Sequence, residues 1–301
     1  MKSYGENMNR NKSFFSVLLA LAAVPIISGC GGDEPDIVEL IVRDYSVLKV
    51  QTDNAVGAKW QEGDSLTVYT LSSTSHYHYT LASGIGSTTA NFNRQPTLVE
   101  FDADAQCYAL TASQNIYGVS STDDGQMKLT YKLPEEYEAE QLSTEGGSFL
   151  LNVPSWGELT FDANGHPLAT LNPLTAFLKV NLSAVPDNTR YILVTTHDSI
   201  RLNGDQIAGG AGEPLAGNFD CILEDGATLT ASHIFKYDDI IRVALDEGFL
   251  PLGHLYIPIV AGHYERLQVV ALAEEYYFDY EWKGTLLSTF NGQQFALNSI
   301  K

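Results

Sequence analysis

The chain has 301 residues, of which 44% are apolar and 18% charged, a composition typical of a folded protein long enough to bury a large core. Its formal net charge is −20, so phosphate backbones and anionic lipid surfaces repel it. This charge argues against nucleic-acid binding and leaves covalent attachment as the expected route to a membrane.

The first 29 residues are organised like a secretory signal. A polar, net basic leader precedes an apolar run from Phe14 to Ile27. The run has 14 residues, which suits the hydrophobic region of a signal peptide and is too short to span a bilayer. We therefore expect residues 1–29 to direct export rather than to form a buried helix.

The sequence IISGC at residues 26–30 resembles the lipobox of bacterial lipoproteins. The resemblance implies cleavage between Gly29 and Cys30 and a diacylglycerol on the Cys30 thiol. Two or more acyl chains anchor a protein stably where a single chain is marginal. Residues 30–36 then form a flexible acidic tether, which resembles the signal that follows the cysteine in some surface lipoproteins. A plain solvated linker explains the same residues.

The other two cysteines, Cys107 and Cys221, form no CxxC or zinc-knuckle pattern. They could pair with each other or stand as separate buried apolar residues. We favour separate burial, because free cysteine is among the most buried residue types.

From residue 37 onward, apolar residues recur with a period of two, which predicts strands. The clearest alternating runs are 127–133, 178–182 and 276–282. Dipeptides suited to hairpin turns separate such runs: Asp124-Gly125, Asn164-Gly165, Asn203-Gly204, Asp225-Gly226 and Asn291-Gly292. The sequence therefore predicts an all-β fold of antiparallel sheets. Whether one short helix follows Pro134 is not decided by the sequence.

A domain boundary is expected near Pro173, because residues 155–173 are rich in turn-forming residues and a confident strand follows. The boundary divides the mature chain into an N-terminal domain of residues 37–173 and a C-terminal domain of residues 174–301. No internal repeat shows that the two halves are duplicates.

Motifs that would carry chemistry are weak. His76 and His78 lie on one face of a predicted strand and could begin a zinc or copper site, but no further ligands are evident. The acidic runs 102–105 and 121–125 lack the ligand spacing of an EF-hand. No GxSxG, HExxH or P-loop occurs, so we expect no catalytic residues, no cofactor and no metal. A hydrolase with carboxylates that converge only in space remains an alternative.

Five stretches resemble, in the same order along the chain, the fimbrillin-like proteins that form type V pili: residues 58–70, 107–113, 129–138, 171–184 and 254–272. The first reads AKWQEGDSLTVYT and the last HLYIPIVAGHYERLQVVAL. The chain departs from the family at Thr111-Ala112, where many members have Tyr-Pro, and at Ala261, where proline is usual.

The resemblance implies two transthyretin-like, Greek-key β-sandwich domains, lipoprotein export, and assembly with other pilin subunits at the cell surface. In the family's stalk subunits, a protease cuts after an arginine in the N-terminal strand and opens a groove. The C-terminal strand of another subunit fills that groove by β-strand addition.

Arg43 is the only arginine between Cys30 and Trp60, so the resemblance makes Arg43–Asp44 the candidate cleavage site. An intact first strand with an outward arginine is the competing interpretation, and it would leave the protein on its lipid as an anchor. The candidate donor strand lies in residues 285–301, with apolar residues Leu287, Phe290, Phe295, Leu297 and Ile300. The competing interpretation, which we slightly favour, is that this segment is the last strand of its own domain.

We therefore expect a structural or adhesive subunit of cell-surface fimbriae that is a lipoprotein of the outer membrane. The alternative is a surface lipoprotein that binds glycan or host protein without polymerising, with the aromatic run 276–282 as its platform.

Overall fold

The fold is described from a computed structural model, in which residues 41–301 form one compact unit. Residues 1–42 lie outside the described residues, and with them Gly29, Cys30 and the acidic tether. The structure describes residues 43–52, 58–71, 76–96, 105–144, 149–196, 202–203, 206–207, 213–224, 227, 229–231, 237–246, 253–273, 277–286 and 295–297.

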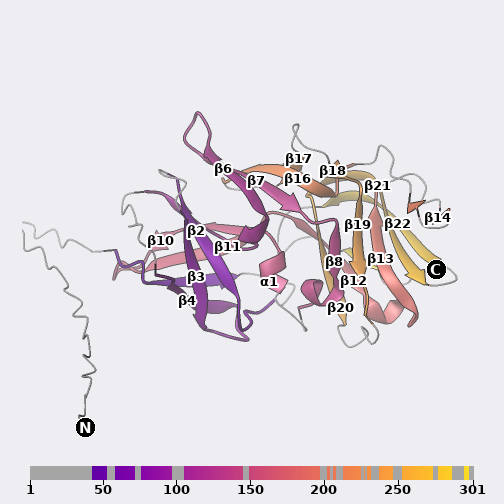
Figure 1. The fold of residues 1–301 in the computed structure, drawn as a ribbon, viewed down its shortest axis with the longest axis horizontal. Helices are drawn as coiled ribbons and strands as arrows, with labels where there is room; N and C mark the ends of the chain where they lie inside the picture. The colour runs from indigo at the N-terminus through magenta and orange to yellow at the C-terminus, as the bar shows by residue number, and fades with distance from the viewer. Residues whose placement is uncertain are drawn as a thin grey trace, which may run out of the picture. The chain divides into compact units, whose positions relative to one another are not determined.

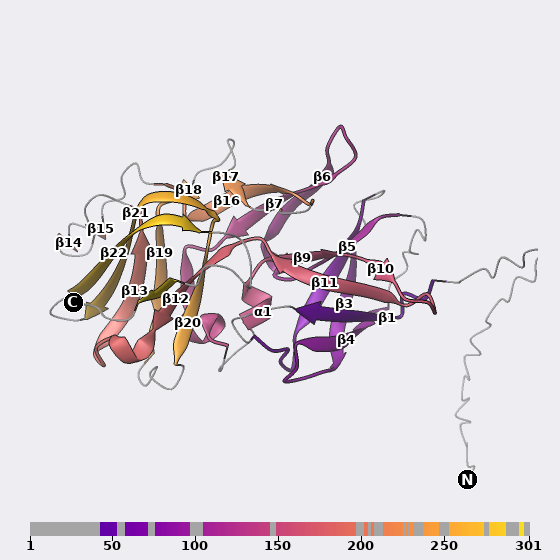
Figure 2. The same cartoon turned by 180° about the vertical axis from the view of Figure 1, so that it is seen from behind.

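The N-terminal part of the unit is a sheet that closes on itself (Figures 1 and 2). Its strands follow the order β1 (Val47–Thr52), β4 (Thr89–Arg94), β3 (His76–Ser83), β2 (Ser65–Thr70), β5 (Cys107–Leu110), β9 (Ser155–Glu158) and β11 (Pro167–Pro173). β1 also pairs with β11, so these seven strands form a ring, and β10 (Thr160–Phe161) lies beside β11.

Four further sheets complete the described part. The largest runs β22 (Tyr277–Leu286), β21 (Gly262–Ala273), β13 (Thr189–Thr195), β19 (Ile240–Ala244) and β8 (Glu136–Glu138). A three-stranded sheet contains β20 (His254–Ile259), β12 (Ala176–Asn181) and β23 (Phe295–Leu297). The remaining strands are β17 (Thr230–Ala231), β16 (Ala216–Ile222), β7 (Met127–Leu133) and β6 (Ile116–Ser121), with β18 (Tyr237–Asp238) on β16, and the hairpin of β14 (Leu202–Asn203) and β15 (Gln206–Ile207).

Helical structure in the described residues is short. The α-helix α1 spans Phe149–Asn152, and 3₁₀ turns lie at η1 (Ser113–Asn115), η2 (Ala139–Leu142) and η3 (Leu182–Ala184). The segment after Pro134 is therefore the strand β8 followed by the 3₁₀ turn η2 rather than an α-helix. Pairing of β8 with β19 and burial of Tyr137 at 4% exposure outweigh the local helical tendency.

Three core clusters organise the unit. The closed-sheet core lies inside the ring, where Trp60 and Phe92 meet edge to face with ring centroids 4.8 Å apart. The C-terminal core is shared by β12 and β20 on one side and β13, β19 and β21 on the other. The middle core joins β2, β5 and β9 to β7 and β16 through Tyr69, Tyr108, Trp156, Leu129, Tyr131 and Phe219.

The all-β prediction is confirmed, but the sheets are not purely antiparallel. β1–β11, β12–β23 and β8–β19 are parallel pairs. Each joins strands that are far apart in the sequence, where the long intervening chain supplies the crossover that a parallel pair requires. The closed ring also differs from the predicted two-layer sandwich, because β1 bonds on both edges and joins the two ends of the sheet.

The alternating runs behave as predicted where side chains are described. Met127, Leu129, Tyr131 and Leu133 are buried, and Leu178, Val180 and Leu182 are buried with Lys179 and Asn181 more exposed. Residues 277–286 form β22, although the burial of their side chains lies outside the described residues. Gly125 and Gly165 have φ values of 77° and 80°, which confirms the turns predicted at 124–125 and 164–165.

The turn predicted at 203–204 lies between β14 and β15, which pair as a hairpin through Asn203 and Gln206, although residue 204 is outside the described part. The dipeptides 225–226 and 291–292 also fall outside it.

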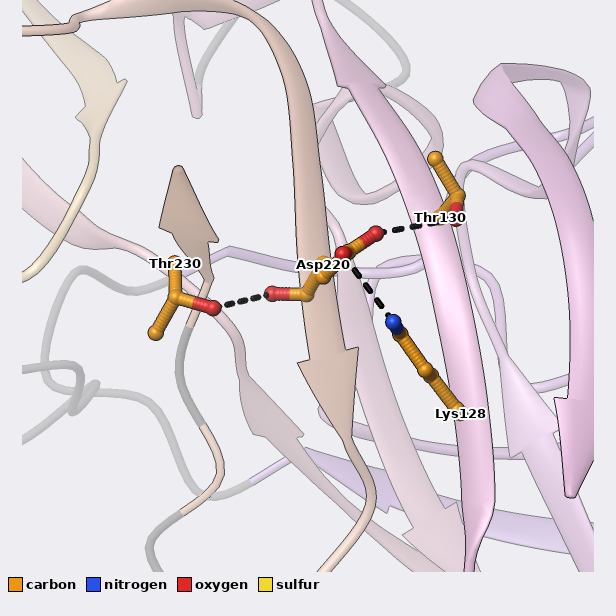
Figure 3. Close-up of polar contacts among 4 residues, drawn as sticks. All are labelled: Lys128, Thr130, Asp220 and Thr230. Carbon is orange, nitrogen blue, oxygen red and sulfur yellow. Dashed lines mark hydrogen bonds and ion pairs between the residues drawn. The ribbon is translucent and has the colours of Figure 1, made fainter. Parts of the chain in front are cut away.

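Polar contacts tie β7 to β16 (Figure 3). The Asp220 carboxylate accepts a hydrogen bond from Thr130 Oγ1 at 3.0 Å and lies 3.1 Å from Lys128 Nζ. Thr230 Oγ1 donates to the Asp220 carbonyl at 3.0 Å, which links β17 to the same strand. β7 precedes Pro173 and β16 follows it, so these bonds cross the predicted domain boundary, which itself stays a prediction.

Gly157 in β9 is a position where the fold leaves no room for a side chain. A Cβ atom there would lie 2.4 Å from the carbonyl oxygen of Thr170 in β11. Because that oxygen is backbone, it cannot rotate away. We expect Gly157→Ala to lower the free energy of unfolding by about 1–3 kcal/mol, measured from the urea midpoint.

The matched control is Gly262→Ala in β21, where a Cβ atom would have nothing within 4 Å. An equal loss of stability in both variants would contradict the close approach of β9 and β11.

Candidate functional site

The candidate site is the junction at Arg43 and Asp44, where the chain leads into β1. β1 reads VLKVQT, and its alternate residues Leu48, Val50 and Thr52 are buried. Val50 stands opposite two small residues, Ala90 of β4 and Ala169 of β11. This alternation fixes the register of β1. The junction therefore lies just before the start of β1, at one end of the closed sheet.

The β10–β11 hairpin holds the junction. The backbone N–H of Asp44 donates to the Gly165 carbonyl at 3.0 Å. The Arg43 guanidinium carbon lies 4.4 Å from the centroid of the Phe161 ring, a cation–π contact. The Tyr45 ring meets Phe161 edge to face at 5.5 Å. One aromatic ring therefore contacts the side chains on both sides of Asp44.

The residues that follow Asp44 are anchored inside the unit. Tyr45 is 6% exposed, and its carbonyl accepts a hydrogen bond from the Tyr79 hydroxyl at 2.7 Å. The Arg94 backbone N–H donates to the Ser46 carbonyl at 2.9 Å. The C-terminal side of the Arg43–Asp44 bond is thus part of the folded sheet, although both side chains of the bond are exposed.

Carboxylates cap the turns on both sides of this contact. The backbone N–H of Ser46, followed by its hydroxyl, lowers the pKa of Asp44. The backbone N–H groups of His166 and Asn164 bond to Asp162 at 2.9 and 2.8 Å, and the former is the larger cause of that carboxyl's lowered pKa. Both carboxyls are therefore charged near neutral pH and accept from the turn backbone.

A protease cuts a peptide bond that it can bind in an extended form, so hydrolysis at Arg43–Asp44 requires local opening of the contacts around it. β1 begins at Val47, after the candidate bond. A cut there would leave β1 and the closed sheet in place and would remove only the residues before Asp44.

The C-terminal candidate segment is partly described. Phe295 and Leu297 belong to β23, which pairs in parallel with β12 through Leu178↔Phe295 and Val180↔Leu297. Leu287, Phe290 and Ile300 lie outside the described residues. Residues 295–297 therefore form a strand on their own chain, and donation of the segment to another subunit stays a prediction.

The other candidate residues stand apart from the junction. His76 and His78 are exposed on β3. The thiols of Cys107 and Cys221 are reduced and buried in different core clusters, and burial raises the pKa of Cys221 to about 12. Ser121 ends β6, and residues 122–125 lie in the turn between β6 and β7.

In the described ranges, no group of three or more His, Cys, Asp or Glu side chains is placed to hold a metal ion. Within the same ranges, every helix is too short or too polar to cross a bilayer.

Sequence reasoning did not identify Phe161, Gly165 or Tyr79 as residues that hold the junction. The Asn164-Gly165 turn was a visible signal, but its contact with Asp44 spans about 120 residues and leaves no local pattern.

Comparison with known proteins gives structural likeness only. No family model matches the sequence, and no curated protein does. Solved structures that resemble the chain include adhesion and fimbrial proteins. A Bacteroides ovatus protein with a provisional cell-adhesion assignment is 9% identical with a TM-score of 0.46, over 82% of this chain and 90% of that one.

A fimbrial protein from Bacteroides ovatus is 11% identical with a TM-score of 0.38, over 86% of this chain and 50% of that one. The tip fimbrial protein Mfa3 from Porphyromonas gingivalis, in a form with a C-terminal truncation, is 9% identical with a TM-score of 0.32, over 78% of this chain and 80% of that one. These scores are too low to establish a shared fold or function.

Phe161→Leu tests whether the ring protects the junction. Leucine keeps an apolar side chain but removes the cation–π contact with Arg43, which is worth about 0.5–1 kcal/mol at an exposed site. We expect an arginine-specific protease to cut the Arg43–Asp44 bond about two- to fivefold faster in this variant. The rate is measured from the appearance of the fragments by mass spectrometry.

Tyr191→Leu is the control, because Tyr191 is an exposed ring beneath another arginine, Arg242, at 5.8 Å. An unchanged cleavage rate in Phe161→Leu, or an equal increase in Tyr191→Leu, would contradict the protective role of Phe161.

Proposed function

We propose that the chain is a structural or adhesive, non-enzymatic subunit of cell-surface fimbriae. In this proposal it is exported as an outer-membrane lipoprotein with an acyl anchor on Cys30, and it joins other pilin subunits by β-strand addition. The two predicted domains, 37–173 and 174–301, would be its two halves, and the first contains the closed sheet. The observation that carries the proposal is the arrangement of the C-terminal strand β23.

β23 is a short strand on the edge of a small sheet. Its described residues 295–297 pair with β12 on one edge, and β20 pairs with β12 on the other. The β12 residues opposite it, Leu178 and Val180, are fully buried in the C-terminal core. In the described part of the chain, residues 295–297 pair with β12, and their departure would expose that edge of β12.

An exposed strand edge is a template for another chain, because its N–H and C=O groups need partners. β-strand addition satisfies these groups through main-chain bonds, and alternate side chains supply specificity. The segment 285–301 can therefore serve β12 of its own chain or an acceptor edge in another subunit. This dual use is what a strand-exchanging subunit requires.

The N-terminal junction supports the same proposal from the other end. A cut between Arg43 and Asp44 would separate the subunit from the lipid on Cys30 while β1 still closes the ring. The acceptor for a donor strand would then not be the position of β1, which stays in its sheet.

The proposal predicts that cleavage triggers assembly. Incubation of the purified chain with an arginine-specific protease should produce higher oligomers on non-boiled gels. We expect Arg43→Ala to remain monomeric, because the N-terminal segment would stay attached. A chain that ends at residue 286 should be cut normally and yet fail to assemble, because its donor strand is absent.

Arg242→Ala is the matched control, since Arg242 is an exposed arginine in β19 far along the chain from the junction. Equal polymerisation of Arg43→Ala and the unmodified chain would refute the cleavage step. Persistent monomers of every variant would favour the alternative, a surface lipoprotein that binds glycan or host protein without polymerising.

A further inference from the structure

Two histidines lie side by side on the outer face of the closed sheet. His76 and His78 alternate along β3 with the buried residues Tyr77 and Tyr79. Their rings are both exposed, and the ring centroids are 5.2 Å apart. We propose that this pair binds a divalent transition-metal ion.

The spacing of the rings suits a metal ion. An ion held tetrahedrally by one nitrogen of each ring, at about 2.0–2.1 Å, places the two ring centres about 5 Å apart. The observed separation is 5.2 Å, with an angle of 78° between the ring planes. Because the χ2 torsion of histidine is broad, the exposed His76 ring can rotate to aim a nitrogen at an ion.

A pair of hydroxyls holds the His78 ring. The buried Thr67 Oγ1 lies 2.8 Å from Ser113 Oγ, within hydrogen-bond distance. The same Thr67 oxygen lies 3.2 Å from Nδ1 of His78. This contact engages Nδ1 and orients the ring, which leaves Nε2 as the nitrogen that can bind a metal ion.

The His76 ring is also positioned by a neighbour. It lies against the Tyr69 ring with centroids 5.5 Å apart and planes tilted by 35°. Tyr69 stands directly opposite His76 on β2, as Thr67 stands opposite His78. Each imidazole thus has its own support on the adjacent strand, which lowers the cost of ordering the pair when an ion binds.

The ligand chemistry identifies the class of ion. Imidazole nitrogen favours Cu²⁺, Ni²⁺ and Zn²⁺ over Mg²⁺ and Ca²⁺, which prefer oxygen. The described residues supply two protein ligands, so water would complete the coordination shell. A net charge of −20 raises the local concentration of cations at the surface.

Calorimetric titration of the full chain with NiCl2 tests the proposal. We expect one saturable site, which His76→Asn and His78→Asn each weaken about tenfold or more. The control His263→Asn, an exposed histidine of β21, should bind as the unmodified chain does. Undiminished affinity in the His76→Asn/His78→Asn double variant would overturn the site, as would an equal loss in His263→Asn.

Thr67 is tested as a positioning residue. Thr67→Val removes the hydrogen-bond partner of His78 Nδ1 and should weaken Ni²⁺ binding about tenfold, whereas Thr67→Ser keeps a hydroxyl and should restore it. Urea midpoints of both variants separate loss of the ligand geometry from loss of the fold. Full affinity in Thr67→Val would overturn the role assigned to Thr67.

Discussion

The parallel pairing of β1 with β11 is the contact on which the rest of the N-terminal half depends. β1 bonds to β4 in the antiparallel sense on one edge and to β11 in the parallel sense on the other. Without it, the sheet would have two open edges and the closed-sheet core around Trp60 and Phe92 would be exposed. Closure removes those edges, which protects against pairing with other chains.

The same pairing decides what happens at the N-terminus. It brings the start of β1 to the β10–β11 hairpin, so Asp44 bonds to Gly165 and Arg43 lies on Phe161. The covalent link between the proposed lipid anchor and the folded unit therefore passes through a held junction. Its protection is local and includes the Asp44–Gly165 backbone hydrogen bond, the Phe161 ring and the anchored Tyr45.

The two ends of the chain have different tasks in the proposed function. The strand β1 stays in its sheet, because both of its edges are bonded and its alternate residues are buried. The strand β23 has three paired residues on one edge of β12. In the proposed function β1 is therefore the strand that persists, and β23 is the strand that would be exchanged.

Local features of the fold were predictable from the sequence, and its long-range pairings were not. The strands at 127–133 and 178–182 have alternating apolar residues, and those residues are buried in the structure. The turns at Gly125 and Gly165 require a positive φ, which glycine readily adopts. Closure by β1 and the placement of Tyr137 in β8 depend on partners about 100 residues away. Phe161 likewise gives no local sign that Arg43 will lie on its ring.

The most direct test is the intact mass of the subunit in fimbriae isolated from cells. We predict a chain that begins at Asp44 and carries no lipid, because assembly follows the cut that separates the folded unit from Cys30. Assembled chains that still carry an acylated Cys30 would contradict this proposal.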